Sequence, residues 1–142
     1  MHAILSHGAD GDKWVPIGET SRVATILVHV TCGPENPTKA ALSFLVAKAA
    51  VDEGHEVTMF VAGDGVQLLR DSVLDSLTGL GTGSLRESYD AVVAAGTRIY
   101  ASGMSSKARG VTDSDFEGKP VELAMPSRLV QLALEADRIF TY

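Results

Sequence analysis

The sequence predicts an α/β fold, a Rossmann-like three-layer α/β/α sandwich built on a mostly parallel five-stranded sheet. Nearly continuous apolar runs rich in β-branched residues, such as RVATILVHVT at 22–31, are typical of strands buried on both faces of a parallel sheet. These runs alternate along the chain with longer segments whose apolar residues recur at helical spacing. Regular alternation of strands and helices predicts a sheet with helices on both faces.

The first strand, 22–31, is followed by the turn sequence CGPENP and then by a helix from Pro37 to about Glu53. Asn36 is a favourable N-cap, and Pro37 suits the first helical position because its missing N–H has no partner there anyway. Gly54 is placed to end the helix. We expect an inward-facing stripe made of Leu42, Leu45, Val46 and Ala49.

The second strand is expected over 56–62, and the glycine-rich turn 63–65 leads into a second helix. The glycines of TGLGTG at 78–83 predict a flexible loop. Ser84 then begins a third helix, with Glu87 three residues on as in a capping box, and Gly96 ends it. The second helix has apolar residues at helical spacing at Val66, Leu69, Val73 and Leu77, and the third has Leu85, Tyr89, Val92 and Val93.

The last third of the chain repeats the alternation with shorter elements. A short helix or tight turn is expected within 103–110, and a mainly polar loop with one helical turn within 112–119. Pro126 opens the final helix, whose apolar residues include Leu129 and Leu132. The remaining strands are expected over 97–102, 121–124 and 138–142.

A chain of 142 residues is most simply one domain, which we place at 22–142. Residues 1–21 form a leader without clear periodicity, interrupted by glycines and by Pro16. This leader contains Trp14, the only tryptophan of the chain, flanked by apolar residues. It either docks on the body or on a neighbouring subunit, or it is partly ordered, as termini often are.

Composition excludes several classes of function. A net charge of −6 with only 12 Lys and Arg lacks the basic footprint of a nucleic-acid-binding protein. No apolar run approaches the roughly 20 residues that a membrane-spanning helix needs. A single cysteine excludes an internal disulfide and suits a reducing, cytoplasmic setting. The four histidines are scattered, so we expect no metal site, and nothing in the sequence calls for a cofactor.

Ligands of open α/β sheets bind outside the carboxyl ends of the strands. Three loops are expected at that edge, at 31–36, 63–65 and 102–109. Small residues allow close approach of a ligand, helix N-termini attract anions, and hydroxyls with cations suit a phosphate, sulfate or carboxylate. The candidate ligand-binding residues are Gly33, Asn36, Gly63, Asp64, Ser102, Ser105, Lys107 and Arg109.

Each of these signals also has a purely structural explanation. Cys32, the candidate catalytic residue, is a possible nucleophile near a helix N-terminus, but cysteines that only pack in a core are commoner, and we favour packing. Asp64 either orients a ligand or caps the following helix. Ser105, Ser106, Lys107 and Arg109 belong either to an anion site or to a helical turn that the serines start, in which the two cations are solvated or pair with acidic neighbours. The sequence does not decide whether the protein is an enzyme.

Three stretches resemble the DsrE/DsrF-like family, which includes sulfur-relay subunits. They are GPENPTKAALSFLVAKAAVDEGHEVTMFVAGDGV at 33–66, AGTRIYAS and GMSSKARGV at 95–111, and LVQLALEADRIFTY at 129–142. The resemblance covers roughly residues 22–142. It implies a compact α/β/α domain that assembles into homotrimers or homohexamers. It also implies, for some members, a persulfide carried on a cysteine in the loop after the strand that corresponds to 97–102.

The chain departs from that pattern where it matters for sulfur chemistry. The sulfur-relay cysteine falls at Ser102, and Ser105 is the second position where members of the family have cysteine. A hydroxyl cannot carry a persulfide. We therefore expect an oligomeric protein that binds a small anionic ligand without persulfide chemistry at the family position. The alternatives are a sulfurtransferase or sulfur-relay protein that uses Cys32, and a non-catalytic subunit of a sulfur-relay-like assembly.

Overall fold

A five-stranded sheet forms the centre of the computed structural model, which describes residues 5–7, 14–16 and 22–142. The strand order is β8-β7-β4-β3-β9, and every neighbouring pair is parallel. All the carboxyl ends therefore meet at one edge of the sheet. The strands are β3 (Thr25–Val30), β4 (Glu56–Val61), β7 (Arg98–Ser102), β8 (Val121–Ala124) and β9 (Arg138–Thr141).

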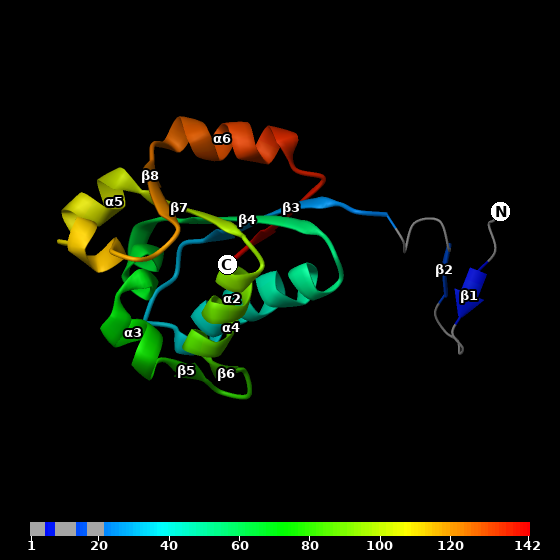
Figure 1. Cartoon of the computed structure of the whole chain (residues 1–142), viewed down its shortest axis with the longest axis horizontal. Helices are drawn as coiled ribbons and strands as arrows, with labels where there is room; N and C mark the ends of the chain where they lie inside the picture. Colours follow the sequence, from blue (N-terminus) through cyan, green and yellow to red (C-terminus); the bar gives the residue numbers. More distant parts are fainter. Residues whose placement is uncertain (1–4, 8–13, 17–21) are drawn as a thin grey trace.

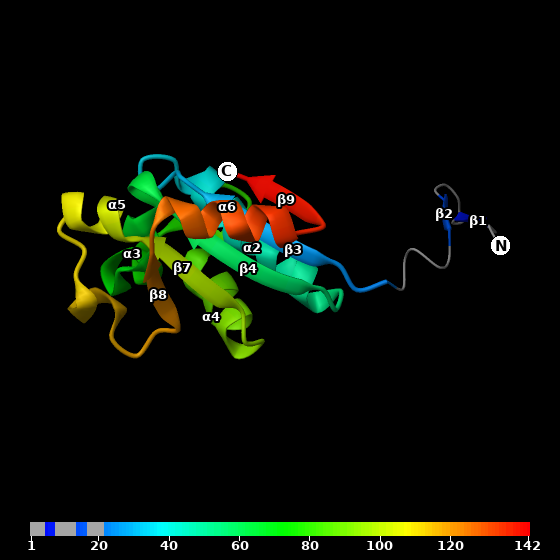
Figure 2. The ribbon, with the colours of Figure 1, turned by 90° about the horizontal axis from the view of Figure 1, so that it is seen from above.

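Helices cover both faces of this sheet, which confirms the Rossmann-like three-layer fold (Figure 1). Helices α2 (Pro37–Asp52) and α4 (Leu85–Ala94) lie on one face, and α6 (Pro126–Glu135) lies on the other. The view from above shows α6 running across the strands while β9 borders one side of the sheet (Figure 2). Within the described residues, no helix has the length and apolar character needed to cross a membrane.

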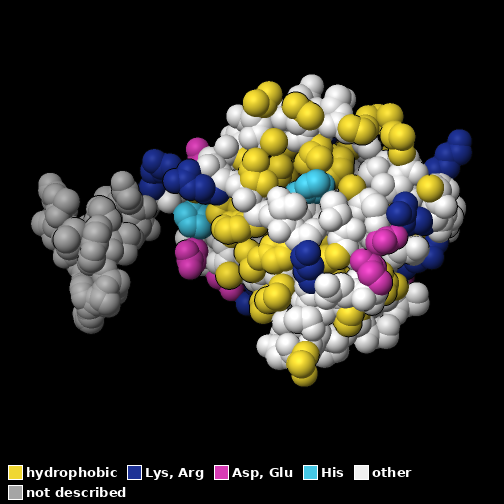
Figure 3. Space-filling view, turned by 180° about the vertical axis from the view of Figure 1, so that it is seen from behind, with side chains coloured by type: hydrophobic (Ala, Val, Ile, Leu, Met, Phe, Trp, Pro, Cys, Tyr) yellow, Lys and Arg dark blue, Asp and Glu magenta, His cyan; other side chains and the backbone are white. Residues whose placement is uncertain are grey.

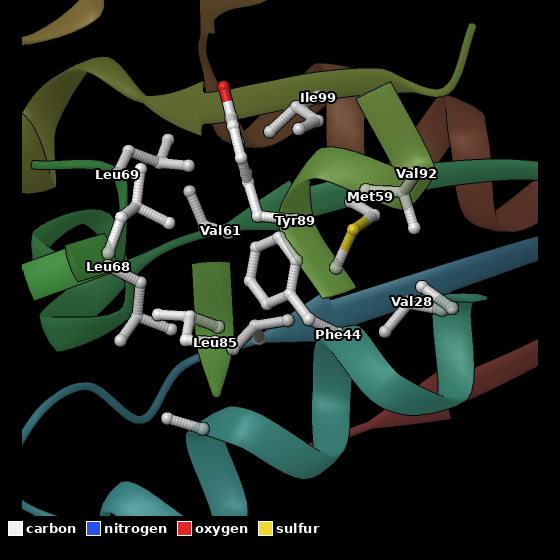
Figure 4. Packing of buried hydrophobic residues seen from close by; sticks show 14 of the residues in the cluster. Val28, Phe44, Met59, Val61, Leu68, Leu69, Leu85, Tyr89, Val92 and Ile99 are labelled. Atoms are coloured by element: carbon white, nitrogen blue, oxygen red, sulfur yellow. The ribbon is translucent and has the colours of Figure 1, made fainter. Parts of the chain in front are cut away.

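The main core lies between the sheet and the pair α2 and α4 (Figure 4). Phe44 of α2 and Met59 of β4 are completely buried there, and Tyr89 of α4 packs beside Phe44 with ring centroids 6.2 Å apart. On the other face, Leu27, Phe60 and Tyr100 form a smaller cluster beneath α6. Alternate residues of β3, β4 and β7 thus supply the two cores, as expected for strands buried on both faces.

The buried face of α2 differs from the predicted stripe. Leu42, Leu45 and Val46 are only partly buried, and Ala49 is exposed. The helix is apolar around most of its surface, so hydrophobic spacing alone does not single out one face. The small side chains of the buried face allow α2 to pack close to the sheet and α4. The buried residues are Ala40, Ala41, Ser43, Phe44, Ala47 and Ala50.

The predicted second helix is divided in two. Residues Gly63–Leu69 form a 3₁₀ helix, η1, and α3 covers only Asp71–Ser76. The break falls at Arg70, which has extended backbone angles (φ −76°, ψ 138°) and cannot continue a helix. Of the apolar residues at helical spacing, Val66 and Leu69 before the break and Leu77 after it are nevertheless buried, while Val73 is partly buried.

The expected flexible loop at 78–83 forms a small antiparallel hairpin, β5 (Thr78–Gly79) and β6 (Gly83–Ser84). Leu80 donates its backbone N–H to the Thr38 hydroxyl at 3.0 Å, which fastens the hairpin to α2. A Cβ at Gly79 would come within 2.8 Å of the Thr38 Cα, so this glycine permits close contact with α2 rather than flexibility.

The other expected elements are present, with boundaries shifted by a few residues. β3 starts at Thr25 rather than at residue 22, and the Ser84 hydroxyl caps α4 by accepting the Glu87 N–H at 3.2 Å. The segments predicted to hold short helical turns contain α5 (Gly103–Ala108) and the 3₁₀ helix η2 (Asp113–Phe116).

Most of the leader predicted over residues 1–21 lies outside the described residues. Within it, β1 (Leu5–His7) pairs with β2 (Trp14–Pro16) in an antiparallel arrangement. The two alternatives for the leader, docking or partial order, fall outside the part of the chain that the structure describes.

The buried face of α2 can be tested by comparing Phe44→Ala with Leu45→Ala. We expect Phe44→Ala to lower the free energy of unfolding by about 3–5 kcal/mol, because it leaves a cavity in the main core. Leu45→Ala should cost about 1 kcal/mol or less, since that side chain is only partly buried. Urea denaturation of both variants measures the difference. Equal losses, or a larger loss for Leu45→Ala, would contradict the packing described above.

Candidate functional site: the carboxyl edge of the sheet

The loops that follow β3 and β4 are in direct backbone contact at the carboxyl edge. A Cβ at Gly33 would collide with the carbonyl oxygen of Asp64, and one at Gly65 would collide with that of Val30. Only glycine allows the two loops to come this close. The sequence placed these loops at one edge, and the structure adds that they touch.

The third loop is fastened to the second by two side chains of the segment 102–110. The backbone N–H of Gly63 donates to the Ser105 hydroxyl at 2.8 Å. The Arg109 guanidinium donates to the Asp64 carboxylate at 2.9 Å and forms an ion pair with it. Five of the predicted ligand-binding residues, Gly33, Gly63, Asp64, Ser105 and Arg109, are therefore brought together, but they mostly bind one another.

Ser102 and Ser105, where the resemblance implies cysteine in other members, both support the local backbone. Ser102 ends β7, is only 7% exposed, and caps α5 by accepting the Ser105 N–H at 3.1 Å. Ser105 accepts the Gly63 N–H, as described above. A cap of this kind is typically worth about 1 kcal/mol, so these hydroxyls have a structural role that explains their presence.

Cys32 lies just beyond the end of β3 and belongs to the main core, with 8% of its surface exposed. Burial raises the pKa of the Cys32 thiol, and the nearby Glu35 carboxylate raises that pKa further. The Lys39 ammonium acts in the opposite direction but is a smaller influence. The thiol is thus held in its protonated form, which is a poor nucleophile.

The first loop binds a carboxylate of its own. The backbone N–H of Gly33 donates to both carboxylate oxygens of Glu35, at 3.0 and 2.9 Å. Glu35 was not predicted as a site residue, although an acidic side chain beside a helix N-terminus is a recognisable signal. The Asn36 side chain is turned to its own helix, where it accepts the Lys39 N–H at 3.2 Å.

The two predicted cations differ in their surroundings. The Arg109 guanidinium, besides its ion pair with Asp64, donates to the carbonyl oxygen of Ser105 at 3.3 Å. Its side chain is 30% exposed. Lys107 lies in the last turn of α5 and is exposed to solvent. Lys107 is therefore the more accessible of the two positive charges at this edge.

Sequence reasoning missed Arg70, which holds the end of α5 in place. Its guanidinium donates to the carbonyl oxygens of Arg109 at 3.2 Å and Gly110 at 2.8 Å, and lies 3.7 Å from the Asp115 carboxylate. A cation in an otherwise apolar segment was the only signal for it. The Ser106 hydroxyl is buried without a hydrogen-bond partner among the described residues, and no feature of the sequence indicated this.

Among residues 22–142, together with the two short described segments of the leader, no three His, Cys, Asp or Glu side chains gather as a metal site would require. The carboxyl edge carries backbone N–H groups, hydroxyls and the two cations Lys107 and Arg109. Such groups bind anions through hydrogen bonds and charge.

Comparisons with known proteins agree with this architecture. A model of the DsrE/DsrF-like family matches residues 24–142. An uncharacterized protein of Methanopyrus kandleri is 30% identical over 132 residues, which cover 89% of this chain and all of that protein (100%).

Two solved structures share the fold. The crystal structure of the YchN protein from E. coli has a TM-score of 0.66 at 15% identity, over 85% of this chain and 100% of that one. A conserved protein of unknown function from Bacteroides thetaiotaomicron has a TM-score of 0.58 at 13% identity, over 84% of this chain and 95% of that one. Since the family model spans nearly all of the sheet and its helices, this chain belongs to the DsrE/DsrF-like family.

Proposed function

We propose that this protein is an oligomeric member of its family that binds a small anion at the carboxyl edge and carries no persulfide at Ser102. The observation that supports this most directly is the Gly33 amide, which binds both oxygens of the Glu35 carboxylate. That amide lies just before the N-terminus of α2, where the helix dipole favours negative charge. The Gly33 N–H can thus bind an anion, and the Glu35 side chain of the same protein is the anion that it binds here.

An external anion would compete with Glu35 for this amide. Glu35 is exposed, so its side chain can move into solvent without disturbing the core. Lys107 and Arg109 add positive charge at the same edge, and Asp64 offsets part of the charge of Arg109. An oxyanion such as sulfate or phosphate has the charge and the acceptor atoms that this arrangement recognises.

Removal of the internal carboxylate tests this competition. In Glu35→Gln, we expect inorganic sulfate and phosphate to bind about three- to tenfold more tightly than in the natural protein, because a neutral amide competes less well for the Gly33 N–H. Titration of each anion, followed through the ¹⁵N–¹H signal of Gly33, gives the affinity. Glu135→Gln, which removes an exposed charge from the end of α6, is the matched control and should bind as the natural protein does. Absence of a saturable shift at Gly33 in all three proteins would refute the anion site.

Sulfur relay through Cys32 is the alternative enzyme function, and the environment of the thiol argues against it. A sulfur carrier needs an accessible thiolate. Cys32 is buried, and its raised pKa favours the neutral thiol. Because the folded state disfavours the thiolate, this contribution to stability is present below the ordinary pKa of a thiol and is lost as the pH rises through the raised pKa.

Thiol reactivity distinguishes these alternatives. We expect iodoacetamide to alkylate Cys32 in the native protein at least about tenfold more slowly than in urea, because reaction requires local opening of the core. Measurement of the rate between pH 7 and pH 10 should show the native thiol ionising at higher pH than the unfolded one. Incubation with a sulfur donor provides a second readout by intact mass. Addition of one sulfur atom to the native protein, lost in Cys32→Ser, would overturn the proposal in favour of sulfur relay.

Assembly is supported by the apolar surface on the α6 side of the sheet. Every residue of α6 is at least partly exposed, and all four residues of β9 are exposed. We define the α6 surface as Val130 and Leu134 of α6 with Ile139 of β9, which are 58%, 82% and 47% exposed. The view from behind shows hydrophobic side chains spread over the side that β9 borders (Figure 3). Exposed apolar surfaces of this kind mark contacts between proteins.

We expect the purified chain to have three or six times its 14.9 kDa mass by light scattering. Leu134→Glu should lower that mass, because it introduces a charge into the proposed contact. Leu80→Glu alters another exposed apolar side chain, at the tip of the β5–β6 hairpin, and should leave the mass unchanged. Dissociation by Leu80→Glu but not by Leu134→Glu would contradict the α6 surface as the contact.

The same exposed surface favours a second candidate function, that of a non-catalytic subunit that completes the site of another family chain. A monomeric mass for the purified natural chain would contradict the homotrimer and homohexamer. It would instead favour a mixed assembly. Co-purification with a family member that carries the cysteine would then be the direct test.

A further inference from the structure

The amino edge of the sheet, opposite the candidate site, holds three adjoining hollows that share the side chain of His55. Their volumes are about 490, 230 and 300 Å³. His55 lies just before β4, where the sequence showed only an isolated histidine. Small-ligand sites are concave and combine apolar lining with a few placed polar groups.

A hydrogen bond from the backbone fixes the orientation of the His55 ring. Its Nδ1 atom accepts the backbone N–H of Ala24 at 3.0 Å, so the neutral ring carries its proton on Nε2. Nε2 lies 3.8 Å from the Glu53 carboxylate, and the side chain is 20% exposed. His55 therefore offers an N–H donor at the point where the hollows meet.

The hollow of about 230 Å³ is suited to an anionic group. Arg22 and Arg138 line it with His55, and Asp137 is the acidic residue among its lining side chains. The Asp137 carboxylate already accepts the Thr25 N–H at 2.8 Å, and Arg138 donates to the carbonyl oxygen of Asp137 at 2.7 Å. The lining of this hollow thus includes two arginines and one carboxylate, and that carboxylate is already bound to the backbone.

The hollow of about 300 Å³ is apolar and adjoins the hollow of about 230 Å³. Val46 and Ala49 of α2 and Phe140 of β9 line it, with Glu53 at the end near His55. Alternation along β9 places Arg138 and Phe140 on the same face of the sheet, about 7 Å apart. A cation and an aromatic ring at this separation match a molecule with an anionic end and a short apolar body.

We propose that the amino edge is a second binding site, for a small organic carboxylate with an aryl or short alkyl body. The guanidinium groups of Arg22 and Arg138 bind the carboxylate, His55 donates a hydrogen bond to it, and the apolar hollow takes the body. The Glu53 carboxylate, 3.8 Å from Nε2 of His55, competes with the ligand carboxylate for that donor. In the view from behind, basic, acidic and histidine side chains lie together at one end of the molecule, beside apolar surface (Figure 3).

The apolar hollow, which Phe140 lines, lies on the face of β9 that is turned to α2. The α6 surface lies on the other face of β9. Phe140 pairs in register with Val28 of the main core, and Ile139 pairs with Leu27 of the cluster under α6. The proposed ligand site is therefore distinct from the proposed contact between chains and from the anion site at the carboxyl edge.

Titration of the full chain with phenylacetate tests the proposal through the imidazole ¹H–¹³C signals of the histidines. We expect the His55 signal to shift to saturation, while His29, within β3, stays unchanged. Acetate and benzyl alcohol, which supply the anionic group and the ring separately, should each bind at least about tenfold more weakly than phenylacetate. Phenyl phosphate tests whether the site takes a phosphate ester in place of a carboxylate.

Two variants locate the ligand. Arg138→Gln should weaken phenylacetate binding about tenfold, while Arg128→Gln, which removes a cation from α6, should leave it unchanged. Ala49→Leu fills the apolar hollow and should weaken binding of phenylacetate to the level of acetate, while acetate binds as before.

Three results would overturn the proposal. One is a His55 signal that no probe shifts. Another is equal weakening by Arg138→Gln and Arg128→Gln. The third is a His55 signal that changes with protein concentration but not with phenylacetate, which would mean that a second copy covers the hollow. The Gly33 signal in the same titration reports the carboxyl edge separately, so failure of one site does not imply failure of the other.

Discussion

Parallel pairing of β3 with both β4 and β9 is the constraint on which the rest of the structure depends. Parallel neighbours require crossover connections, so each helix returns the chain to the same side before the next strand begins. The loops that follow the strands are thereby collected at one edge, and those that precede them at the other. Both proposed ligand sites lie at these edges, whose chemistry is set by the residues that flank the strands.

At the carboxyl edge, most of the polar groups form hydrogen bonds or ion pairs within and between the loops. Contact between the first two loops depends on glycines, and the third is tied to the second through Ser105 and Arg109. Ser102 is buried as a helix cap, at a position where a relay cysteine would have to react. An edge in which hydroxyls hold the backbone and the lone thiol is buried suits recognition of an anion better than transfer of sulfur.

The amino edge and the outer surface of the sheet have a different character. Among the described helices, α6 is the one that covers the second face of the sheet, and β9 forms a border whose two faces differ. Ile139 lies on the same face of the sheet as α6, while Arg138 and Phe140 lie on the same face as α2. One short strand thus contributes to two proposed contacts of different chemistry, because its side chains alternate between the faces.

The sequence by itself determined the fold class, the strand order along the chain, the caps at Asn36 and Ser84 and the convergence of three loops, since these follow from local patterns and from sheet geometry. It did not determine the buried face of α2, because a helix that is apolar nearly all round has no unique inward stripe. Nor did it determine the break at Arg70, the pairing of Glu35 with Gly33 or the hollows around His55. Those depend on contacts between residues far apart in the chain or on backbone angles set by such contacts, which only the tertiary structure decides.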